Sequence, residues 1–462
     1  MFLFPLIYIL SFLKTLKEFS KANASALLVF IVVAMPIYIN TLSVTYMYGL
    51  DSMIGVLQFF KEFVVLIALF IVIFQLKKIP YFTTTDILVG IFLLYSFIFV
   101  LLPIGSYDFI TKLLAYKSLS FFCTLYFVGR FIQIKYVLLS KYFKLISIMT
   151  IAAAVIVLVE YLRNEHLHIH TGFTNFLETY FDGEESGNYG LIWTFETENG
   201  QKRFGSIFGS PLEMGASMVL TLSICLAFYT DFSKKLILSK FGRICLISSF
   251  ICISLALSRA SFIGYLSILG IYAIVTNNRK IIKIIYVGLS FSFIYLIYFI
   301  AQTDIYNFII DSITFNNASS LGHLLEWIDG LEAIVKKPLG LGLGESGRIS
   351  MGSKENTGGE NQFIITGVQV GMPMLIIYCW IHFNLIRKAY QNLWSVSGKT
   401  KRIAFTIFLF KIGIIIPMFT SNTEAFVYIS YFTWFLSGLL INITSRHEAG
   451  KNAQISMQTI LK

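Results

Sequence analysis

The sequence predicts an all-α integral membrane protein that crosses the bilayer about twelve times. Hydrophobic residues make up 56% of the 462 residues, and charged residues make up only 13%, about half of the roughly 25% that is usual in soluble proteins. So few charges cannot cover a surface that faces water, so most of the surface must face lipid. This balance excludes soluble enzymes, secreted disulfide scaffolds and disordered regulators.

Apolar runs long enough to cross a hydrocarbon core of roughly 30 Å recur along the chain. The predicted spans are 24–47, 54–76, 84–103, 113–132, 142–162, 206–230, 241–257, 259–276, 281–301, 363–385, 402–420 and 424–443. The run 1–13 is shorter, and Lys14, Lys17 and Lys21 follow it instead of preceding it. We therefore expect it to be an interfacial helix and not a cleaved signal peptide.

The basic residues predict which side of the membrane each connection faces. Most of the 36 Lys and Arg residues lie in connections that share a side with both predicted chain ends. The positive-inside rule places that side and both termini in the cytoplasm, so the net charge of +11 requires no nucleic-acid partner. The expected organisation is a cytoplasmic or interfacial segment 1–23, helices 24–162, a long periplasmic loop 163–205, helices 206–301, a second long periplasmic loop 302–362, helices 363–443 and a cytoplasmic tail 444–462.

The two long loops are the expected location of any chemistry, because loops of this length are usually functional or disordered. Both fall on the outer side, and the second contains apolar residues at helical spacing, which predict an amphipathic helix lying along the interface. These residues are Leu321, Leu324, Leu325, Ile328, Leu331 and Ile334.

Two arginines lie at the outer ends of predicted spans. Arg203 precedes Ser210-Pro211, a signal for a helix start, so it would sit above a helix N-terminus that favours an anion. Arg259 lies at the outer turn between two apolar runs, where a charge is usually paired or functional. The alternative for Arg203 is an interfacial side chain that meets lipid phosphates, and for Arg259 a turn charge that extends to the surface.

The second loop ends in two further candidate sites. Glycines 340, 342 and 344 alternate, so the backbone N–H groups of Gly342 and Gly344 could form an anion-binding nest, although a flexible turn is the alternative. Glu360 and Asn361 open the next span. Glu360 could be a general base just outside the bilayer or only an acid at a helix N-terminus.

Two other features have structural alternatives. His166, His168 and His170 would share one face of a strand, but no carboxylate or cysteine spacing supports a metal there, so no metal site is predicted.

Lys411 lies in mid-span, where an ionisable group is functional or paired. The carboxylates that could pair with it are Glu62, Glu160 and Glu424.

Taken in order, these elements resemble the O-antigen polymerase/ligase superfamily of bacterial inner membranes. The matching segments are Arg203–Pro211, Ser258-Arg259, the helix around Trp327 that leads into Pro338–Gly344, and Glu360-Asn361. The resemblance implies a metal-independent glycosyltransferase of the GT-C kind, without a cofactor, that uses sugars linked to undecaprenyl pyrophosphate at the periplasmic face. It also implies membrane lipids and a chain-length-determining co-polymerase as partners.

The resemblance further implies roles for individual residues. Arg203 and Arg259 would contact the pyrophosphate, with Arg348 assisting, and Glu360 or His323 would accept the proton of the attacking hydroxyl. The remaining candidate substrate contacts are His323, Asn361, Gly342 and Gly344.

The expected function is O-antigen polymerase, which joins lipid-linked repeat units by inverting transfer. Ligases of the superfamily carry His-Asn where this chain has Glu360-Asn361, which favours the polymerase. Members often carry Arg at the position of His323 and Asn at that of Leu212, so the chain departs from the pattern there. The alternatives are an O-antigen ligase that transfers the glycan to lipid A-core and, from another class, a polytopic transporter or flippase of lipid-linked sugars.

Overall fold

The computed structural model describes residues 1–78, 80–181, 186–279, 282–283, 318–347, 357–395 and 397–460. These ranges contain helices and loops but no strand. The α-helices are α1 (Leu3–Phe19), α2 (Leu27–Ala34), α3 (Tyr38–Met47), α4 (Ile54–Phe74), α5 (Thr84–Leu101), α6 (Phe109–Phe131), α7 (Leu139–Arg163), α8 (Phe173–Phe181), α9 (Pro211–Tyr229), α10 (Lys240–Leu255), α11 (Arg259–Thr276), α14 (Ala318–Lys336), α15 (Gln362–Gln391), α16 (Gly398–Gly413), α17 (Ile415–Thr420) and α18 (Val427–Ile460).

Eight of the described helical segments are long and apolar enough to cross a membrane, and a bent pair, Ala24–Ala34 with Tyr38–Met47, raises the number to nine. The prediction of a polytopic helical protein is confirmed, whereas twelve spans is too many for the described residues. Helix α10 has only 16 residues, short of the about 20 that a span needs. Helix α6 is less apolar than predicted because it carries Lys112, Lys117 and Arg130, and the predicted span 281–301 lies almost wholly outside the described residues.

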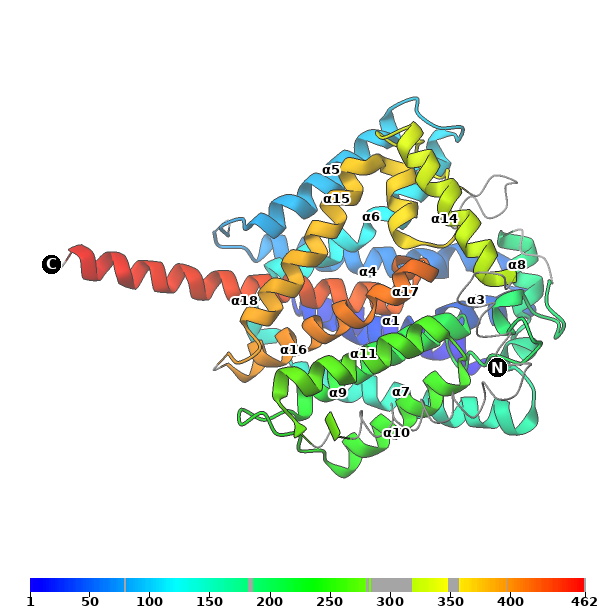
Figure 1. Ribbon diagram of the computed structural model, residues 1–462, viewed down its shortest axis with the longest axis horizontal. Helices are drawn as coiled ribbons and strands as arrows, with labels where there is room; N and C mark the ends of the chain where they lie inside the picture. The colour runs from blue at the N-terminus through cyan, green and yellow to red at the C-terminus, as the bar shows by residue number, and fades with distance from the viewer. Residues whose placement is uncertain are drawn as a thin grey trace.

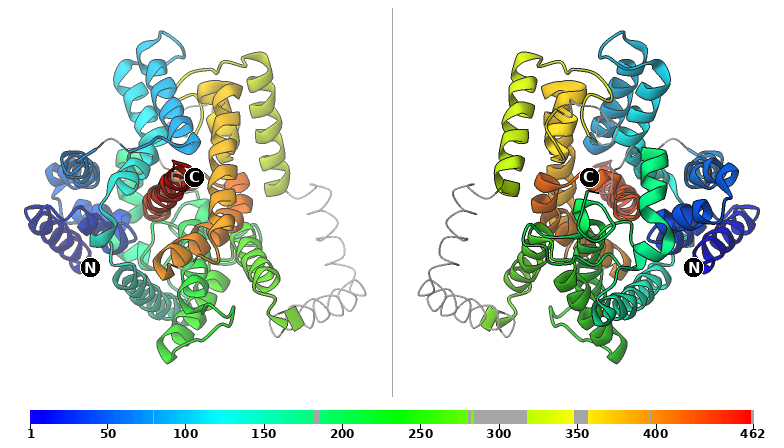
Figure 2. Two further views of the ribbon diagram at one scale, coloured as in Figure 1. Left: turned by 90° about the vertical axis from the view of Figure 1, so that its left-hand side faces the viewer. Right: turned by 90° about the vertical axis from the view of Figure 1, so that its right-hand side faces the viewer.

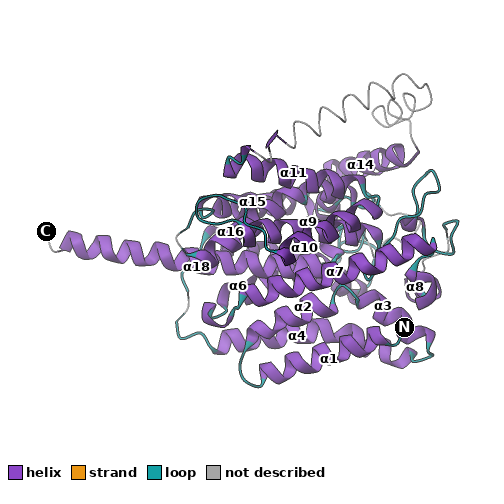
Figure 3. Cartoon of the chain, turned by 90° about the horizontal axis from the view of Figure 1, so that it is seen from below, coloured by secondary structure: helices purple, strands orange, loops and turns teal. Residues whose placement is uncertain are grey.

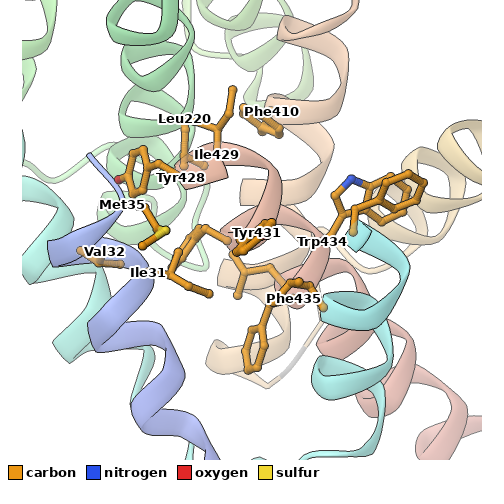
Figure 4. Packing of buried hydrophobic residues seen from close by; sticks show 14 of the residues in the cluster. Ile31, Val32, Met35, Leu220, Phe410, Tyr428, Ile429, Tyr431, Trp434 and Phe435 are labelled. Atoms are coloured by element: carbon orange, nitrogen blue, oxygen red, sulfur yellow. The ribbon is translucent and has the colours of Figure 1, made fainter. Parts of the chain in front are cut away.

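Helix α18 forms the centre of the bundle. Seen end-on, it is surrounded by the other helices (Figure 2), and its side chains pack against α2, α9 and α16 (Figure 4). It approaches α6 at two glycines: a Cβ at Gly129 would collide with Phe435 O, and one at Gly438 with Tyr126 O. Small residues are what allow helix backbones in membrane proteins to come this close.

The bundle has two chemically different ends. The loop end carries residues 164–181 and 186–210 and α14, which lie toward one side of Figure 1. The basic end carries the turns 20–23, 75–78 and 230–239. Thus the described part of the first predicted loop and the helix within the second lie toward the same end of the molecule (Figure 1).

The N-terminal helix differs from the prediction of an interfacial segment. Helix α1 runs alongside α4 through the bundle (Figure 3), and Tyr8 Oη donates to Leu57 O at 2.9 Å. The ring centroid of Phe2 lies 5.8 Å from that of Tyr48 at the loop end. Residue 1 and the C-terminal end of α18 therefore lie at opposite ends of the bundle (Figure 1), so the prediction of two termini on one side is wrong. The short apolar run lies at the edge of the bundle (Figure 3) and buries aromatic side chains on one face against α2 and α4.

Lys411 lies in a structural network in the bundle interior. Its Nζ stands 3.9 Å from the ring centroid of Trp434, and the indole Nε1 donates to both Glu424 carboxylate oxygens at 3.0 Å. Tyr378 Oη also donates to Glu424, at 2.8 Å. Of the three carboxylates predicted as partners of Lys411 (Glu62, Glu160 and Glu424), Glu424 is therefore the one that lies in the same network of contacts. This network favours a structural role for Lys411.

Candidate active site

Arg203 is held at the loop end by backbone hydrogen bonds on both sides. Its N–H donates to Phe195 O at 2.8 Å, and the N–H of Phe204 donates to Leu255 O at 3.1 Å, at the end of α10. Ser210 caps α9 by accepting from Glu213 N at 3.2 Å. The helix start predicted from Ser210-Pro211 is thus present, and Arg203 lies in the segment that leads into it.

Arg259 is the first residue of α11, where Ser258 is the N-cap. Its Nη2 donates to Glu198 Oε1 at 3.2 Å. The Arg259 side chain keeps 55% of its surface exposed, and that of Glu198 keeps 29%. Because this ion pair is partly exposed, it contributes little to stability. The exposed part of the Arg259 guanidinium group can still donate hydrogen bonds to a ligand.

The two arginines form one electrostatic group although 55 positions lie between them in the chain. Burial lowers the pKa of Arg203 from its usual value, the charge of Arg259 lowers it further, and Glu198 opposes both effects. Arg203 Nε is buried and has no hydrogen-bond partner among the described residues. The group of two guanidinium ions and one carboxylate carries one surplus positive charge, which suits a phosphate-bearing ligand.

A cavity of about 180 Å³, named here the Glu360 cavity, opens among the segments that flank Arg203 in the chain. Its wall includes Glu360, Glu213, Ser210 and Tyr38, so residues from α3, α9 and the entry to α15 meet there. Thr194 also lines it, directly before Phe195, whose carbonyl accepts the Arg203 N–H. Two carboxylates therefore line a space whose wall is connected to the backbone of Arg203 through residues 194 and 195.

A second, smaller opening adjoins the Glu360 cavity. It is lined by Ser118 of α6 and Gln369 of α15, among others. Gly347, Ile365 and Asn422 line both spaces. The accessible region therefore extends from α3 and α9 across to α6.

Asn361 has a structural task that the sequence did not reveal. It is the N-cap of α15, and its Oδ1 accepts from Phe363 N at 3.0 Å and from Ile364 N at 3.2 Å. The side chain is buried. Its oxygen is thus engaged by the helix, while Glu360 directly before it faces the cavity.

The glycine run does not form the predicted anion nest. The N–H groups of Gly342 and Gly344 donate to Gln369 O at 3.2 Å and to Gln369 Oε1 at 3.1 Å. They are bound to α15 where Gly371 interrupts the helix with a φ of 84°. The run is a docking segment for the broken helix, so neither N–H is available to an anion.

Substituting Gly342 by alanine is expected to destabilise the protein by about 1–3 kcal/mol. Gly342 has a φ of +126°, and an added Cβ would lie 2.8 Å from Gly105 Cα. Gly270→Ala is the control, because Gly270 is helical with open space around its Cβ position. A thermal shift in detergent measures both variants; equal melting temperatures would contradict the docking role.

Two predicted contacts cannot be placed. Arg348 lies outside the described residues, as does most of the segment between Gly347 and Glu360. His323 is part of α14, but its side chain is not among those described. The alternative of His323 as the base therefore stays open.

The histidine motif is not a strand. Residues Leu167–Thr171 form a 3-10 helix, and no cluster of metal-ligating side chains occurs in the described parts of the chain. His166 and His168 are buried against Phe195, with ring centroids 5.6 Å and 4.6 Å away. His168 Nε2 is 2.7 Å from Phe208 O. These two imidazoles are core side chains that fold the loop.

The buried histidines predict loss of stability in acid. Burial, with a smaller contribution from Lys202, lowers the pKa of His166 from 6.5 to about 4. Below pH 6.5 the unfolded chain gains a proton on His166 that the folded chain does not bind until about pH 4, so stability falls in that window. At pH 5 the loss is about 2 kcal/mol. His166→Phe, compared with the wild type by melting temperature at pH 5 and 7.5, should show a smaller acid shift; an unchanged shift would contradict this assignment.

Three side chains of the site were not predicted from the sequence. Glu213 resembles an ordinary acid in the first turn of a helix, and Tyr38 and Thr194 carry no motif. They reach the cavity through contacts between distant segments, such as the bond from Asn40 Nδ2 to Ile207 O at 2.9 Å. Of these three residues, only Glu213 could have been predicted from the sequence. It is an acidic residue in the chain shortly after the segment that begins with Arg203, four residues after Gly209.

Comparison with known families supports the resemblance. Residues 244–379 match the family model described as O-Antigen ligase. The matched part includes Arg259, α14, the glycine run and Glu360, whereas Arg203 precedes it. No curated protein matches the chain. The chain thus carries an O-antigen ligase-like domain, as expected for the O-antigen polymerase/ligase superfamily.

Proposed function

We propose that this chain is an O-antigen polymerase that joins oligosaccharide repeat units carried on undecaprenyl pyrophosphate, in lipopolysaccharide biosynthesis. The observation that carries the proposal is that the charges of Arg259 and Glu198 act on Arg203 at the loop end, where Glu360 lines a cavity whose wall includes Thr194, close in the chain to Glu198 and Arg203. Surplus positive charge suits a pyrophosphate leaving group, and a neighbouring carboxylate suits activation of a sugar hydroxyl.

In the proposed reaction, a hydroxyl oxygen of the acceptor glycan attacks C1 of the donor sugar. The bond from C1 to the pyrophosphate oxygen breaks, its electron pair leaves on the pyrophosphate, and C1 is inverted. Arg203 and Arg259 stabilise the added negative charge by charge-assisted hydrogen bonds. Glu360 accepts the hydroxyl proton, so the acceptor oxygen gains nucleophilicity as it attacks.

The polymerase is preferred to the ligase because of the residues at the entry to α15. The ligases that this chain resembles carry His-Asn there, and this chain has Glu360-Asn361. Asn361 caps α15 through its Oδ1. The residue that differs between the ligases and this chain is therefore Glu360, which lines the cavity. A change from an imidazole to a carboxylate at this point fits a different acceptor.

The proposed location is the bacterial inner membrane. The positive-inside rule places the basic end in the cytoplasm and the loop end, with the arginine pair, in the periplasm. A separate co-polymerase that sets chain length is part of this proposal.

The proposal is tested by removing the gene and separating the lipopolysaccharide by size. The expected result is lipopolysaccharide with at most one repeat unit, and a gene encoding Arg259→Ala should fail to restore long chains while the wild-type gene restores them. Bare lipid A-core would indicate the ligase or a flippase instead. Long chains in the deletion strain would refute both enzymes.

A further inference from the structure

A cluster of charged side chains lies between α3, α4 and α6, apart from the arginine pair. Lys61 Nζ and Lys117 Nζ both contact Glu62 Oε1, at 3.2 Å and 3.1 Å. Lys61 Nζ also donates to Tyr38 Oη at 2.7 Å. Two ammonium groups therefore share one carboxylate oxygen, and the cluster, named here the Lys117 cluster, has one surplus positive charge.

The position of the cluster makes this surplus charge costly unless an anion meets it. Lys117 lies eight residues into α6 and thus about 12 Å along that helix from its loop end. Its side chain is 44% exposed, whereas those of Lys61 and Glu62 are 12% and 10% exposed. Phe59 of α4 and Leu113 and Leu114 of α6 are exposed too, so the outer surfaces of these two helices include apolar side chains that suit contact with lipid. Ionisable groups at such depth are rare and usually functional.

The cluster is connected to the proposed reaction site by neighbouring residues. Tyr38, which accepts from Lys61, lines the Glu360 cavity. Ser118, next to Lys117 in the chain, lines the adjoining opening. An anionic group at Lys117 would therefore lie one residue along α6 from the wall of the opening that adjoins the Glu360 cavity.

We propose that the Lys117 cluster binds the pyrophosphate of a second polyprenyl-linked glycan, the acceptor, whose tail lies along the apolar face of α4 and α6. This inference rests on the proposed function, because a polymerase joins two lipid-linked substrates. The bond from Lys61 to Tyr38 holds the buried ammonium group in position, Glu62 competes with the phosphate for Lys117, and the exposed Lys117 supplies donors to the phosphate oxygens. The arginine pair then serves the donor alone.

The test counts bound lipids on the purified full-length protein by native mass spectrometry, with undecaprenyl pyrophosphate as the probe. The wild type is expected to bind two molecules, and Lys117→Gln one, with affinity for the second weakened about tenfold or more. Lys21→Gln is the control, because Lys21 is an exposed lysine paired with Glu18 at 2.9 Å but lies at the basic end. It should bind two.

A second variant separates ligand binding from a structural ion cluster. Glu62→Gln removes the competing carboxylate, so the second site should bind more tightly, whereas a purely structural cluster would be damaged by both substitutions. Weaker binding in both variants would overturn the proposal. Equal occupancy of the site by phosphatidylglycerol, offered in place of the probe, would also overturn it, since the site would then be one for bulk anionic lipid.

Arg259→Ala in the same assay distinguishes the two proposals. It should lose the first molecule and keep the one that depends on Lys117. If Lys117→Gln still binds two molecules while Arg259→Ala binds one, the second site is refuted and the polymerase proposal stands. If Arg259→Ala binds two, the pyrophosphate role of the arginine pair fails.

Discussion

Replacing Arg203 by lysine is expected to abolish long O-antigen chains while the protein still accumulates in the membrane. Lysine keeps the positive charge, but it is a point charge and lacks the planar fork that binds two phosphate oxygens together. Loss of one such donor to a developing charge costs on the order of 10²–10³ in rate. The measurement is the lipopolysaccharide size ladder, together with transfer by the purified protein.

Two neighbouring substitutions test the specificity of this effect. Lys202→Gln removes the adjacent cation, whose Nζ donates to Asn164 O at 2.6 Å, and it should leave the ladder in place. Glu198→Gln removes the carboxylate that contacts Arg259 and should retain chains, because it leaves both guanidinium groups. A ladder of normal length from Arg203→Lys would show that the bidentate geometry is not required, and the proposed role of Arg203 would be wrong.

The helices were predictable from the sequence because each depends on local signals. Apolar runs marked helices such as α4 and α9, and Ser210-Pro211 marked where α9 begins. The arginine candidates followed from the same logic: a charge at the apolar end of a span must be paired, solvated or functional. Sequence position therefore predicted Arg203 and Arg259 as candidates, and in the fold the charge of Arg259 lowers the pKa of Arg203.

Two wrong predictions about the loop segments share a cause, which is that contacts with residues distant in the chain decided the structure. The N–H groups of Gly342 and Gly344 looked available until Gln369, on another helix, accepted both. The histidine segment was expected to be a strand, but it forms a 3-10 helix in which the imidazole of His168 packs against the rings of Phe173 and Phe195. Local patterns give no information on which distant group will satisfy a donor or cover a ring.

Substituting Glu360 by glutamine is expected to lower the turnover number about 10²–10⁴-fold, with little change in lipid-linked substrate binding. The amide is nearly isosteric and cannot accept the hydroxyl proton, so the loss should fall on the chemical step. Glu360→His replaces one proton acceptor by another and should retain more activity than the glutamine variant. Turnover and binding are measured separately on purified protein.

Glu213→Gln is the matched control, because Glu213 also lines the cavity but its Oε2 accepts from Gly209 N at 3.1 Å. Its carboxylate holds the segment after Arg203, so its loss should weaken substrate binding more than turnover. If Glu213→Gln stops turnover and Glu360→Gln does not, the base is Glu213. If His323→Gln alone stops turnover, the base lies on α14, and the carboxylates only shape the site. The three variants thus assign the proton acceptor, since each outcome leaves one candidate.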